Sequence, residues 1–277
     1  MAEFQKITES PSPYRHLESM PVRDVLAGIN AEDHKIADVV AGAIPQIARL
    51  VELLIPRMEQ GGRLFYLGAG TSGRLGVLDA SEIPPTYGMP TGVVIGLIAG
   101  GDAALRSSVE SAEDAGEAGW RELLAHDISP LDTVVGIAAS GTTPYVAGAL
   151  RRCREAGILT ASITCNPASP VAQEADIAIE VVTGAEFVTG STRMKAGTAQ
   201  KLVLNMISTA TMIGLGRVED NRMVHMQLAN EKLVDRGTRM ITATTGLPYD
   251  TARTLLLEHG SVSRAINHWR KERSPKE

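Results

Sequence analysis

Three short segments rich in glycine, serine and threonine have the residue types that bind phosphate groups. They are residues 68–73 (GAGTSG), 140–143 (SGTT) and 190–192 (GST), and a helical pattern follows each of them. Glycine lets the backbone turn sharply and lets a ligand come close to it. A helix N-terminus attracts anions through its free N–H groups and its dipole. Together the three segments favour a site for a phosphate or a polyol.

Two other uses of these segments stay open. Ser and Thr ahead of a helix commonly act as N-caps, which needs no ligand. Gly68, Gly70 and Gly73 also have the spacing of the dinucleotide fingerprint G-x-G-x-x-G, although no acidic residue follows at the expected distance. None of the segments has the Gly-Lys-Ser/Thr ending of a P-loop.

Acidic side chains are the candidates for proton transfer. Two carboxyl groups can act as acid and base when their surroundings separate their pKa values. Alternatively, these carboxylates belong to solvated helix faces, and we prefer this interpretation for Glu110 and Asp114. Spacing alone does not show which of the remaining carboxylates are catalytic. The carboxylates concerned are Glu82, Glu110, Glu113, Asp114, Asp79 and Asp102.

Two basic residues, Arg193 and Lys195, lie beside the third segment in STRMKAG. Either could pair with a phosphate or a carboxylate, and an exposed pair without a ligand is the alternative. A cation at the N-terminus of a helix is unfavourable with the helix dipole. The position therefore favours an anionic partner.

The composition argues against several classes of protein. Cys153 and Cys165 are the only cysteines and lack metal-ligand spacing, so we expect two buried thiols in a reducing compartment. No apolar run approaches the ~20 residues of a membrane span, and the N-terminus lacks the apolar core of a signal peptide. The net charge of −5 argues against a nucleic-acid partner. We expect a cytoplasmic protein without a membrane segment, metal or cofactor.

The surrounding sequence repeats a unit of apolar strand, loop and helix. The strands are apolar throughout, which is typical of a parallel sheet covered by helices on both faces. Ligands of such sheets bind at the carboxyl ends of the strands, where the strand order reverses. Pro84 and Pro85 predict the end of the helix after the first segment. The strands are expected at residues 64–67, 92–98, 133–138, 159–165 and 177–182.

Helical patterns account for most of the remaining chain. Residues 1–20 are polar and form either a flexible tail or an arm that wraps a neighbouring subunit. We divide the chain into residues 1–60 (arm and helices packed on the core), 61–218 (the sheet domain) and 219–277 (a small helical region). Helices are expected at residues 22–30, 33–60, 104–110, 114–125, 144–156, 202–213, 226–234, 249–259 and 261–270, with a linker at 242–246.

Several long motifs between about Ile7 and Arg236 resemble those of one enzyme family. They are YLGAGTSGRLGVLDASEIPPTYG, GLIAGGDAAL, SAEDAG, GIAASGTTPYVAGAL, TGSTRMKAGTAQKLVLNMIST and NEKL. These segments are similar to those of the N-acetylmuramic acid 6-phosphate etherases. The resemblance implies the sugar isomerase (SIS) fold, a doubly wound five-stranded parallel sheet flanked by helices, here with N-terminal helices and a small C-terminal helical region.

The resemblance also implies an activity. The family cleaves the D-lactyl ether of N-acetylmuramic acid 6-phosphate with water during cell-wall sugar recycling and needs no cofactor. Its acid falls on Glu82 and its second catalytic glutamate on Glu113. Glu113 would remove the C2 proton beside the opened C1 aldehyde, and protonated Glu82 would assist the departing lactate. Expected phosphate and sugar ligands are Gly70, Thr71, Ser72, Ser140, Gly141, Thr142, Thr143, Ser191, Thr192 and Lys195.

Two other functions remain open for a chain of this fold. One is an SIS phosphosugar isomerase, which uses the same enolisation without losing a C3 substituent. The other is a non-catalytic regulator that senses a phosphosugar, against which the presence of both Glu82 and Glu113 argues. A homodimer is expected, because SIS sites often form between subunits.

Overall fold

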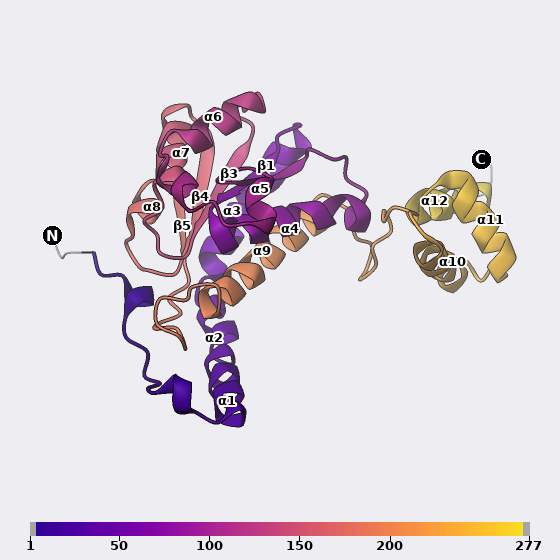
Figure 1. The fold of residues 1–277 in the computed structure, drawn as a ribbon. Helices are drawn as coiled ribbons and strands as arrows, with labels where there is room; N and C mark the ends of the chain where they lie inside the picture. The colour runs from indigo at the N-terminus through magenta and orange to yellow at the C-terminus, as the bar shows by residue number, and fades with distance from the viewer. Residues whose placement is uncertain (1–3, 274–277) are drawn as a thin grey trace. The chain divides into compact units, whose positions relative to one another are not determined.

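The computed structural model describes residues 4–273 apart from the side chain of Glu110, and it contains a sheet of five parallel strands (Figure 1). Most strand residues are buried, as expected for a parallel sheet with both faces covered. The predicted fold class is confirmed. The strands are β1 (Leu64–Gly68), β2 (Val94–Ile98), β3 (Thr133–Ala138), β4 (Leu159–Thr164) and β5 (Ile177–Glu180).

The strand order is β2-β1-β3-β4-β5. Strand β1 pairs with β2 on one side and with β3 on the other, so the order reverses between β1 and β3. The crevice at such a reversal is the usual ligand site of a doubly wound sheet. Two of the three glycine-rich segments leave the sheet there, because residues 68–73 follow β1 and residues 140–143 follow β3.

Helices cover the sheet, and β1 shows how its two faces are used. Phe65 and Leu67 belong to a buried cluster that also contains residues of α6, α7 and α8, whereas Tyr66 faces Gly76 of α4. Helix α9 runs beside α4 (Figure 1), to which hydrogen bonds join it. These helices are α4 (Gly70–Tyr87), α6 (Ala118–Ala125), α7 (Pro144–Glu155), α8 (Pro170–Gln173) and α9 (Lys195–Gly214).

Helix α4 continues through Pro84 and Pro85, so the prediction that these residues end it is wrong. Proline has a helical φ, and its lost hydrogen bond costs about 3 kcal/mol, which packing can offset. Ile83 and Tyr87 supply buried apolar surface in this part of α4. The helix ends at Gly88, where φ is +63° and a Cβ atom would lie 2.1 Å from the His225 carbonyl oxygen.

Three helices replace the two expected before the sheet. They are α1 (Val22–Asp33), α2 (Ile36–Ala41) and α3 (Ile44–Glu59), and Pro45 in the first turn of α3 favours the break before it. No single helix within residues 4–273 is long and apolar enough to cross a membrane. One bent pair, Val22–Ala41 with Ile44–Glu59, meets the requirement by length and composition, with a bend of 55°.

The N-terminal arm is ordered against its own chain from residue 4. It forms two 3₁₀ turns, Ile7–Glu9 and Leu17–Ser19, and it buries Thr8 completely. The flexible tail is therefore wrong for the described part of the arm, and an arm that also wraps a neighbouring subunit stays a prediction.

Other boundaries differ more modestly. The helix expected at 104–110 is a single turn, α5 (Ala103–Arg106). A 3₁₀ turn, Glu110–Asp114, precedes α6, which begins at Ala118 instead of residue 114. Helix α9 begins at Lys195, seven residues before the predicted start, because the run of apolar residues that guided the prediction begins only at Leu202.

The chain forms two compact units. The first contains residues up to Ala80 and Gly92–Thr211, and the second contains Ser81–Thr91 and the residues from Met212 onward. The sequence-based division at residues 60 and 218 stays a prediction.

Three helices dominate the second unit. The helix expected at 226–234 is wrong, because Met226 is buried as part of an irregular segment and the Asn230 side chain caps a helix that begins one residue later. The expected linker at 242–246 is also wrong, since that helix continues to Thr245. The helices are α10 (Glu231–Thr245), α11 (Tyr249–His259) and α12 (Val262–Arg273).

Candidate active site

The turn after β1 brings Gly70 and Thr71 to the strand reversal. Helix α4 begins at Gly70, which is exposed, and Thr71 is half-buried. Ser72 is buried, and its hydroxyl donates to Oε1 of Gln200 on α9 at 3.0 Å. Thr71 and Gly70 are therefore the more accessible of the three predicted ligands.

The segment after β3 forms a tight turn. Ser140 Oγ accepts hydrogen bonds from the N–H and the hydroxyl of Thr142 at 3.3 and 3.2 Å. Gly141 has φ +70°, and a Cβ atom there would lie 2.3 Å from Ser169. Thr143 precedes α7 without a side-chain capping bond, so capping does not account for its hydroxyl.

The third segment lies beside the first. A Cβ atom on Gly197 would lie 3.4 Å from Thr71 Cγ2 and 3.6 Å from the Thr192 carbonyl oxygen. Ser191 and Thr192 are half-buried, and the Gly197 N–H donates to the Thr192 carbonyl at 3.0 Å. Hydroxyl-bearing residues from distant parts of the chain therefore meet at this end of the sheet.

Glu113 lines a cavity of about 320 Å³ together with Gly70. The carboxylate is exposed and comes from the 3₁₀ turn Glu110–Asp114. Arg74 also lines the cavity, and its Nε donates to the Leu105 carbonyl oxygen at 3.2 Å. The full lining is Ala69, Gly70, Arg74, Ala99, Ala104, Ser108, Val109 and Glu113. A carboxylate thus faces the same space as the turn after β1.

Glu82 belongs to the second compact unit. It is exposed on the last turns of α4. Residues 225–227 hold this part of the helix, because the Gln227 N–H donates to the Pro85 carbonyl oxygen at 3.0 Å. Glu82 and Glu113 therefore lie in different units.

Lys195 is buried at the start of α9 and pairs with Glu32 of α1. Its Nζ lies 2.6 Å from Glu32 Oε2, and Lys35 Nζ lies 2.7 Å from Oε1. Burial tends to raise the pKa of Glu32, but hydrogen bonds and charge from Lys195 and Lys35 outweigh it and lower the pKa to about 2. The anionic partner that the sequence favours for Lys195 is, in this structure, a protein carboxylate.

Glu186 is a buried residue that the sequence analysis did not single out. Its carboxylate accepts the N–H groups of Lys195 and Ala196 at 3.0 and 2.9 Å, so it caps α9. Burial raises the pKa of Glu186 above its usual value, although these two N–H groups act in the opposite direction. Nothing in the local sequence around residue 186 predicts this contact.

Both cysteines are buried free thiols, as expected. Burial raises the pKa of Cys153 and of Cys165 to about 12, which keeps both protonated and unreactive at neutral pH. Within the described part of the chain, no three His, Cys, Asp or Glu residues are grouped closely enough to hold a metal ion.

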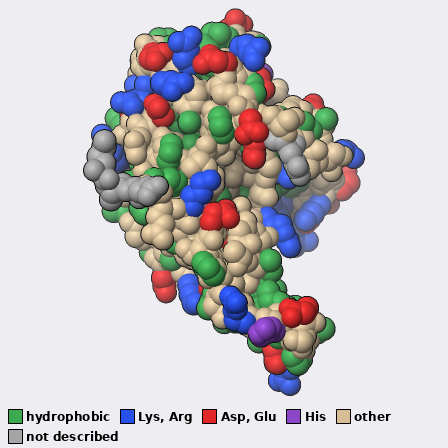
Figure 2. All heavy atoms as spheres, turned by 60° about the vertical axis from the view of Figure 1, so that its left-hand side comes forward, with side chains coloured by type: hydrophobic (Ala, Val, Ile, Leu, Met, Phe, Trp, Pro, Cys, Tyr) green, Lys and Arg blue, Asp and Glu red, His purple; other side chains and the backbone are tan. Residues whose placement is uncertain are grey.

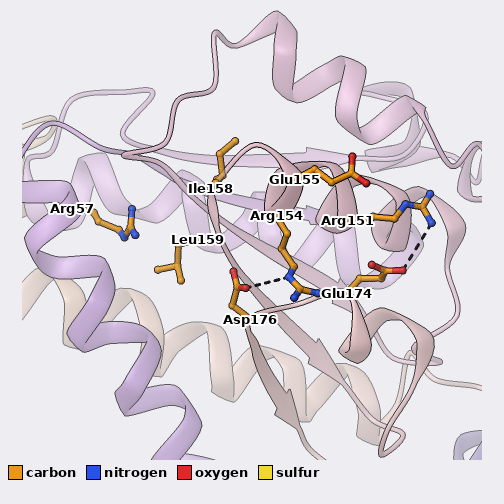
Figure 3. Close-up of a pocket in the computed structure, with 9 residues that line it drawn as sticks. Arg57, Arg151, Arg154, Glu155, Ile158, Leu159, Glu174 and Asp176 are labelled. Carbon is orange, nitrogen blue, oxygen red and sulfur yellow. Dashed lines mark hydrogen bonds and ion pairs between the residues drawn. The ribbon is translucent and has the colours of Figure 1, made fainter.

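A second cavity, of about 540 Å³, lies where β4 begins (Figure 3). Arginines and carboxylates line it, and Arg154 pairs with Asp176 at 3.1 Å while Arg151 lies 3.9 Å from Glu174. Leu159, the first residue of β4, marks this as the amino end of the strands, so the cavity is far from the expected ligand end. The face drawn in Figure 2 likewise shows acidic and basic side chains interspersed.

Models of two domain families match the chain. The SIS domain matches residues 106–210, and the glucokinase regulatory protein N-terminal SIS domain matches residues 46–154. Among solved structures, the phosphoheptose isomerase GmhA from Neisseria gonorrhoeae is 15% identical, with a TM-score of 0.54 over 69% of this chain and 98% of that one. A phosphoheptose isomerase from Francisella tularensis is 16% identical, with a TM-score of 0.52 over 71% of this chain and 100% of that one. These structures support the fold.

Relatives of known name match almost the whole chain. An N-acetylmuramic acid 6-phosphate etherase from Bacteroides thetaiotaomicron is 65% identical over 98% of both chains. One from Porphyromonas gingivalis is 64% identical over 99% of both, and one from Salmonella dublin is 50% identical over 90% of this chain and 84% of its own. The chain belongs to the N-acetylmuramic acid 6-phosphate etherase family.

Proposed function

We propose that this chain cleaves the D-lactyl ether of N-acetylmuramic acid 6-phosphate with water, giving N-acetylglucosamine 6-phosphate and D-lactate. The observation that carries the proposal is the 65% identity to an etherase over 98% of both chains. The geometry supports it, because a carboxylate and the turn after β1 line one cavity at the carboxyl ends of β1 and β2.

The proposed reaction proceeds through an enolate. In the open form of the sugar, the C1 aldehyde acidifies the C2–H bond, and the ether oxygen sits at C3. Glu113 takes the C2 proton, and the electron pair of the C2–H bond is delocalised onto the aldehyde oxygen as an enolate. In the next step this electron pair forms the C2–C3 double bond as the C3–O bond breaks. Glu82 gives a proton to the departing lactate oxygen. Water then adds its oxygen to C3 of the unsaturated aldehyde and a proton returns to C2.

We assign the phosphate to the turn after β3 and the third segment. The N-terminus of α7 favours an anion, whereas that of α9 already binds the Glu186 carboxylate. The hydroxyls ahead of these two helices are those of Ser140, Thr142, Thr143, Ser191 and Thr192. Gly70 and Thr71 then face the sugar. Ser72 and Lys195 already bind Gln200 and Glu32, so their proposed contribution is to hold α9 and α1 in place.

We also propose a cytoplasmic homodimer, because sites in this fold often form between subunits. Sedimentation would show a species of twice the 29.4 kDa chain mass. A species of single-chain mass at all concentrations would contradict the dimer without affecting the assigned chemistry.

The test of function is turnover in water enriched in heavy oxygen. Elimination followed by hydration places the label at C3 of the amino sugar and leaves D-lactate unlabelled. Label in lactate would contradict the enolate route. Absence of D-lactate would contradict the proposed function. In that case, aldose–ketose interconversion would indicate an isomerase. Tight binding without turnover would instead indicate a phosphosugar sensor.

A further inference from the structure

We propose that Asn166 and the N-terminal arm position the Ser140–Thr143 and Gly190–Thr192 segments for phosphate binding. This rests on the proposed function, because it takes these segments as the phosphate site. Asn166 and residues of the arm are then positioning residues that act through the segments they hold.

Asn166 fixes the backbone of the turn after β3. Its side chain is fully buried, and Nδ2 donates to the carbonyl oxygens of Ala139 and Ser140 at 3.2 and 2.9 Å. Because a trans peptide is planar, holding these carbonyls turns the N–H groups of the same peptides to the opposite side. The Cys165 N–H also donates to the Ala139 carbonyl at 3.0 Å, so Asn166 and this backbone bond together orient two consecutive peptides at the start of the segment.

Thr8 of the arm makes two further hydrogen bonds with the Asn166 side chain. Its Oγ1 accepts from Asn166 Nδ2 at 2.9 Å, and its N–H donates to Asn166 Oδ1 at 3.1 Å. Thr8 is also fully buried, so neither residue can exchange these bonds for water. A buried polar group that loses its partner keeps the full cost of its desolvation. The orientation of Asn166 consequently depends on an arm residue 158 positions away in the chain.

Ser12 ties the same arm to the third segment. Its N–H donates to Thr189 Oγ1 at 2.9 Å, and its hydroxyl donates to the Phe187 carbonyl oxygen at 2.8 Å. Thr189 directly precedes Gly190. A single short stretch of the arm therefore holds both hydroxyl-bearing segments, and their spacing depends on where the arm sits.

A purely structural arm would stabilise the fold without affecting the affinity for phosphate. The variants Thr8→Val and Thr8→Ser separate the two roles in the full-length chain. Valine keeps the shape of the side chain but removes the hydroxyl, whereas serine retains it. Thr211→Val is the matched control, because Thr211 is equally buried and its hydroxyl donates within α9 to the Ile207 carbonyl at 2.7 Å.

We expect Thr8→Val to raise KM for the phosphorylated substrate about five- to tenfold, as loss of one buried hydrogen bond predicts. We expect kcat to change less than about twofold, because the reacting groups are untouched. The dissociation constant of inorganic phosphate, measured by calorimetry, should rise by the same factor. Thr8→Ser and Thr211→Val should keep the parental values.

The proposal is overturned if Thr8→Val binds inorganic phosphate as the parent does, or if Thr211→Val weakens binding equally. If Thr8→Val does not fold, the same measurements are made on Ser12→Ala, which removes the hydroxyl that donates to the Phe187 carbonyl oxygen. The phosphate titration needs no turnover. A parent that binds phosphate but releases no D-lactate would therefore contradict the proposed function and leave the positioning role to be judged by the titration alone.

Discussion

Glu113 is the predicted catalytic residue with the clearest structural setting. Its carboxylate is exposed and lines the cavity beside Gly70, so a base there can reach a substrate without a rearrangement of the core. Glu82 is also exposed, on the last turns of α4. The two proposed roles differ in the step they serve, and variants of the two residues should therefore differ in more than overall rate.

Replacing Glu113 by Gln should lower kcat about 100- to 10,000-fold, the usual contribution of a general base. Exchange of the C2 proton with heavy water should be lost as well, because proton removal itself is blocked. Glu82→Gln should slow lactate release by a similar factor but retain C2 exchange. NMR of the substrate in heavy water measures both.

The control for these variants is Glu117→Gln. Glu117 is an exposed residue near Glu113 that lies 3.7 Å from Arg152, a surface pair of little expected energy. It should keep the parental rate. Near-parental rates in both Glu113→Gln and Glu82→Gln would contradict the assignment of these residues as base and acid.

The ion pair of Lys195 with Glu32 makes a separate prediction about stability. Glu32 has a folded pKa of about 2 against an ordinary value of 4.5, so its contribution is complete above pH 4.5 and is lost as the pH falls towards 2. Glu32→Gln should cost about 3 kcal/mol near neutral pH, because it leaves a buried ammonium with a neutral partner. Urea unfolding at several pH values should show the difference from the parent shrinking below pH 4.5.

An exposed pair provides the comparison. Asp235 and Arg239 form an i,i+4 pair on α10, and Asp235 also accepts the Tyr249 hydroxyl at 2.8 Å. Asp235→Asn keeps an oxygen for that hydroxyl, so it should leave stability nearly unchanged. If Glu32→Gln behaved in the same way, or if its effect persisted at pH 2, the ion pair would not be the source of the stability.

The candidate site residues that could be predicted from the sequence are those that stand in a local sequence pattern. The hydroxyls of the three segments stand in glycine-rich turns before helices, and that pattern is visible without a structure. Asn166 and Glu186 stand in no such pattern, because their partners lie far away in the chain or follow a turn of unknown shape. Long-range hydrogen bonds of this kind appear only when the fold is known.

At the scale of the element, α7 has a positive-φ glycine at each end. Gly141 before it has φ +70° and faces Ser169 so closely that no Cβ fits, whereas Gly157 after it has φ +73° and open space around it. The backbone conformation is nearly the same at the two positions. Any difference between alanine variants therefore measures the contact of the turn with Ser169.

Gly157→Ala should cost about 1 kcal/mol through backbone strain alone. Gly141→Ala should cost at least about 2 kcal/mol more, because the turn after β3 must also move away from Ser169. It should weaken binding of inorganic phosphate too, which Gly157→Ala should not. Urea unfolding and calorimetry measure the two effects, and equal losses in both variants would show that the tight contact does not matter.

The sheet was predictable because its strands are short apolar runs, each followed by a turn signal. The ends of the helices were less predictable from the sequence, because they depend on packing. Pro84 and Pro85 are helix breakers by local rules, yet buried Ile83 and Tyr87 hold α4 together around them. Met226 has the apolar character of a helix face, but it packs in an irregular segment ahead of the Asn230 cap.

For the whole molecule, the main feature is that the second unit has a core of its own. Helices α10, α11 and α12 pack on one another around buried residues from all three. The core contains Val234, Ile241, Ala252, Leu256, Val262, Ala265 and Ile266, together with Val224 and Met226 from the preceding segment. A unit with a separate core can open without the other, because local unfolding follows contiguous packed groups.

Two adjacent leucines of α11 test this independence. Leu256 is fully buried, and Leu256→Ala should cost about 2 to 5 kcal/mol, the range for a large-to-small change in a core. Hydrogen exchange followed by mass spectrometry should then speed up across residues 231–273 while β1, β3 and β4 keep their protection. Leu257 is 48% exposed, so Leu257→Ala on the same turn should change neither region. Faster exchange of the sheet in Leu256→Ala would mean that the two units unfold together. The helical unit would then be part of one cooperative folding unit with the sheet.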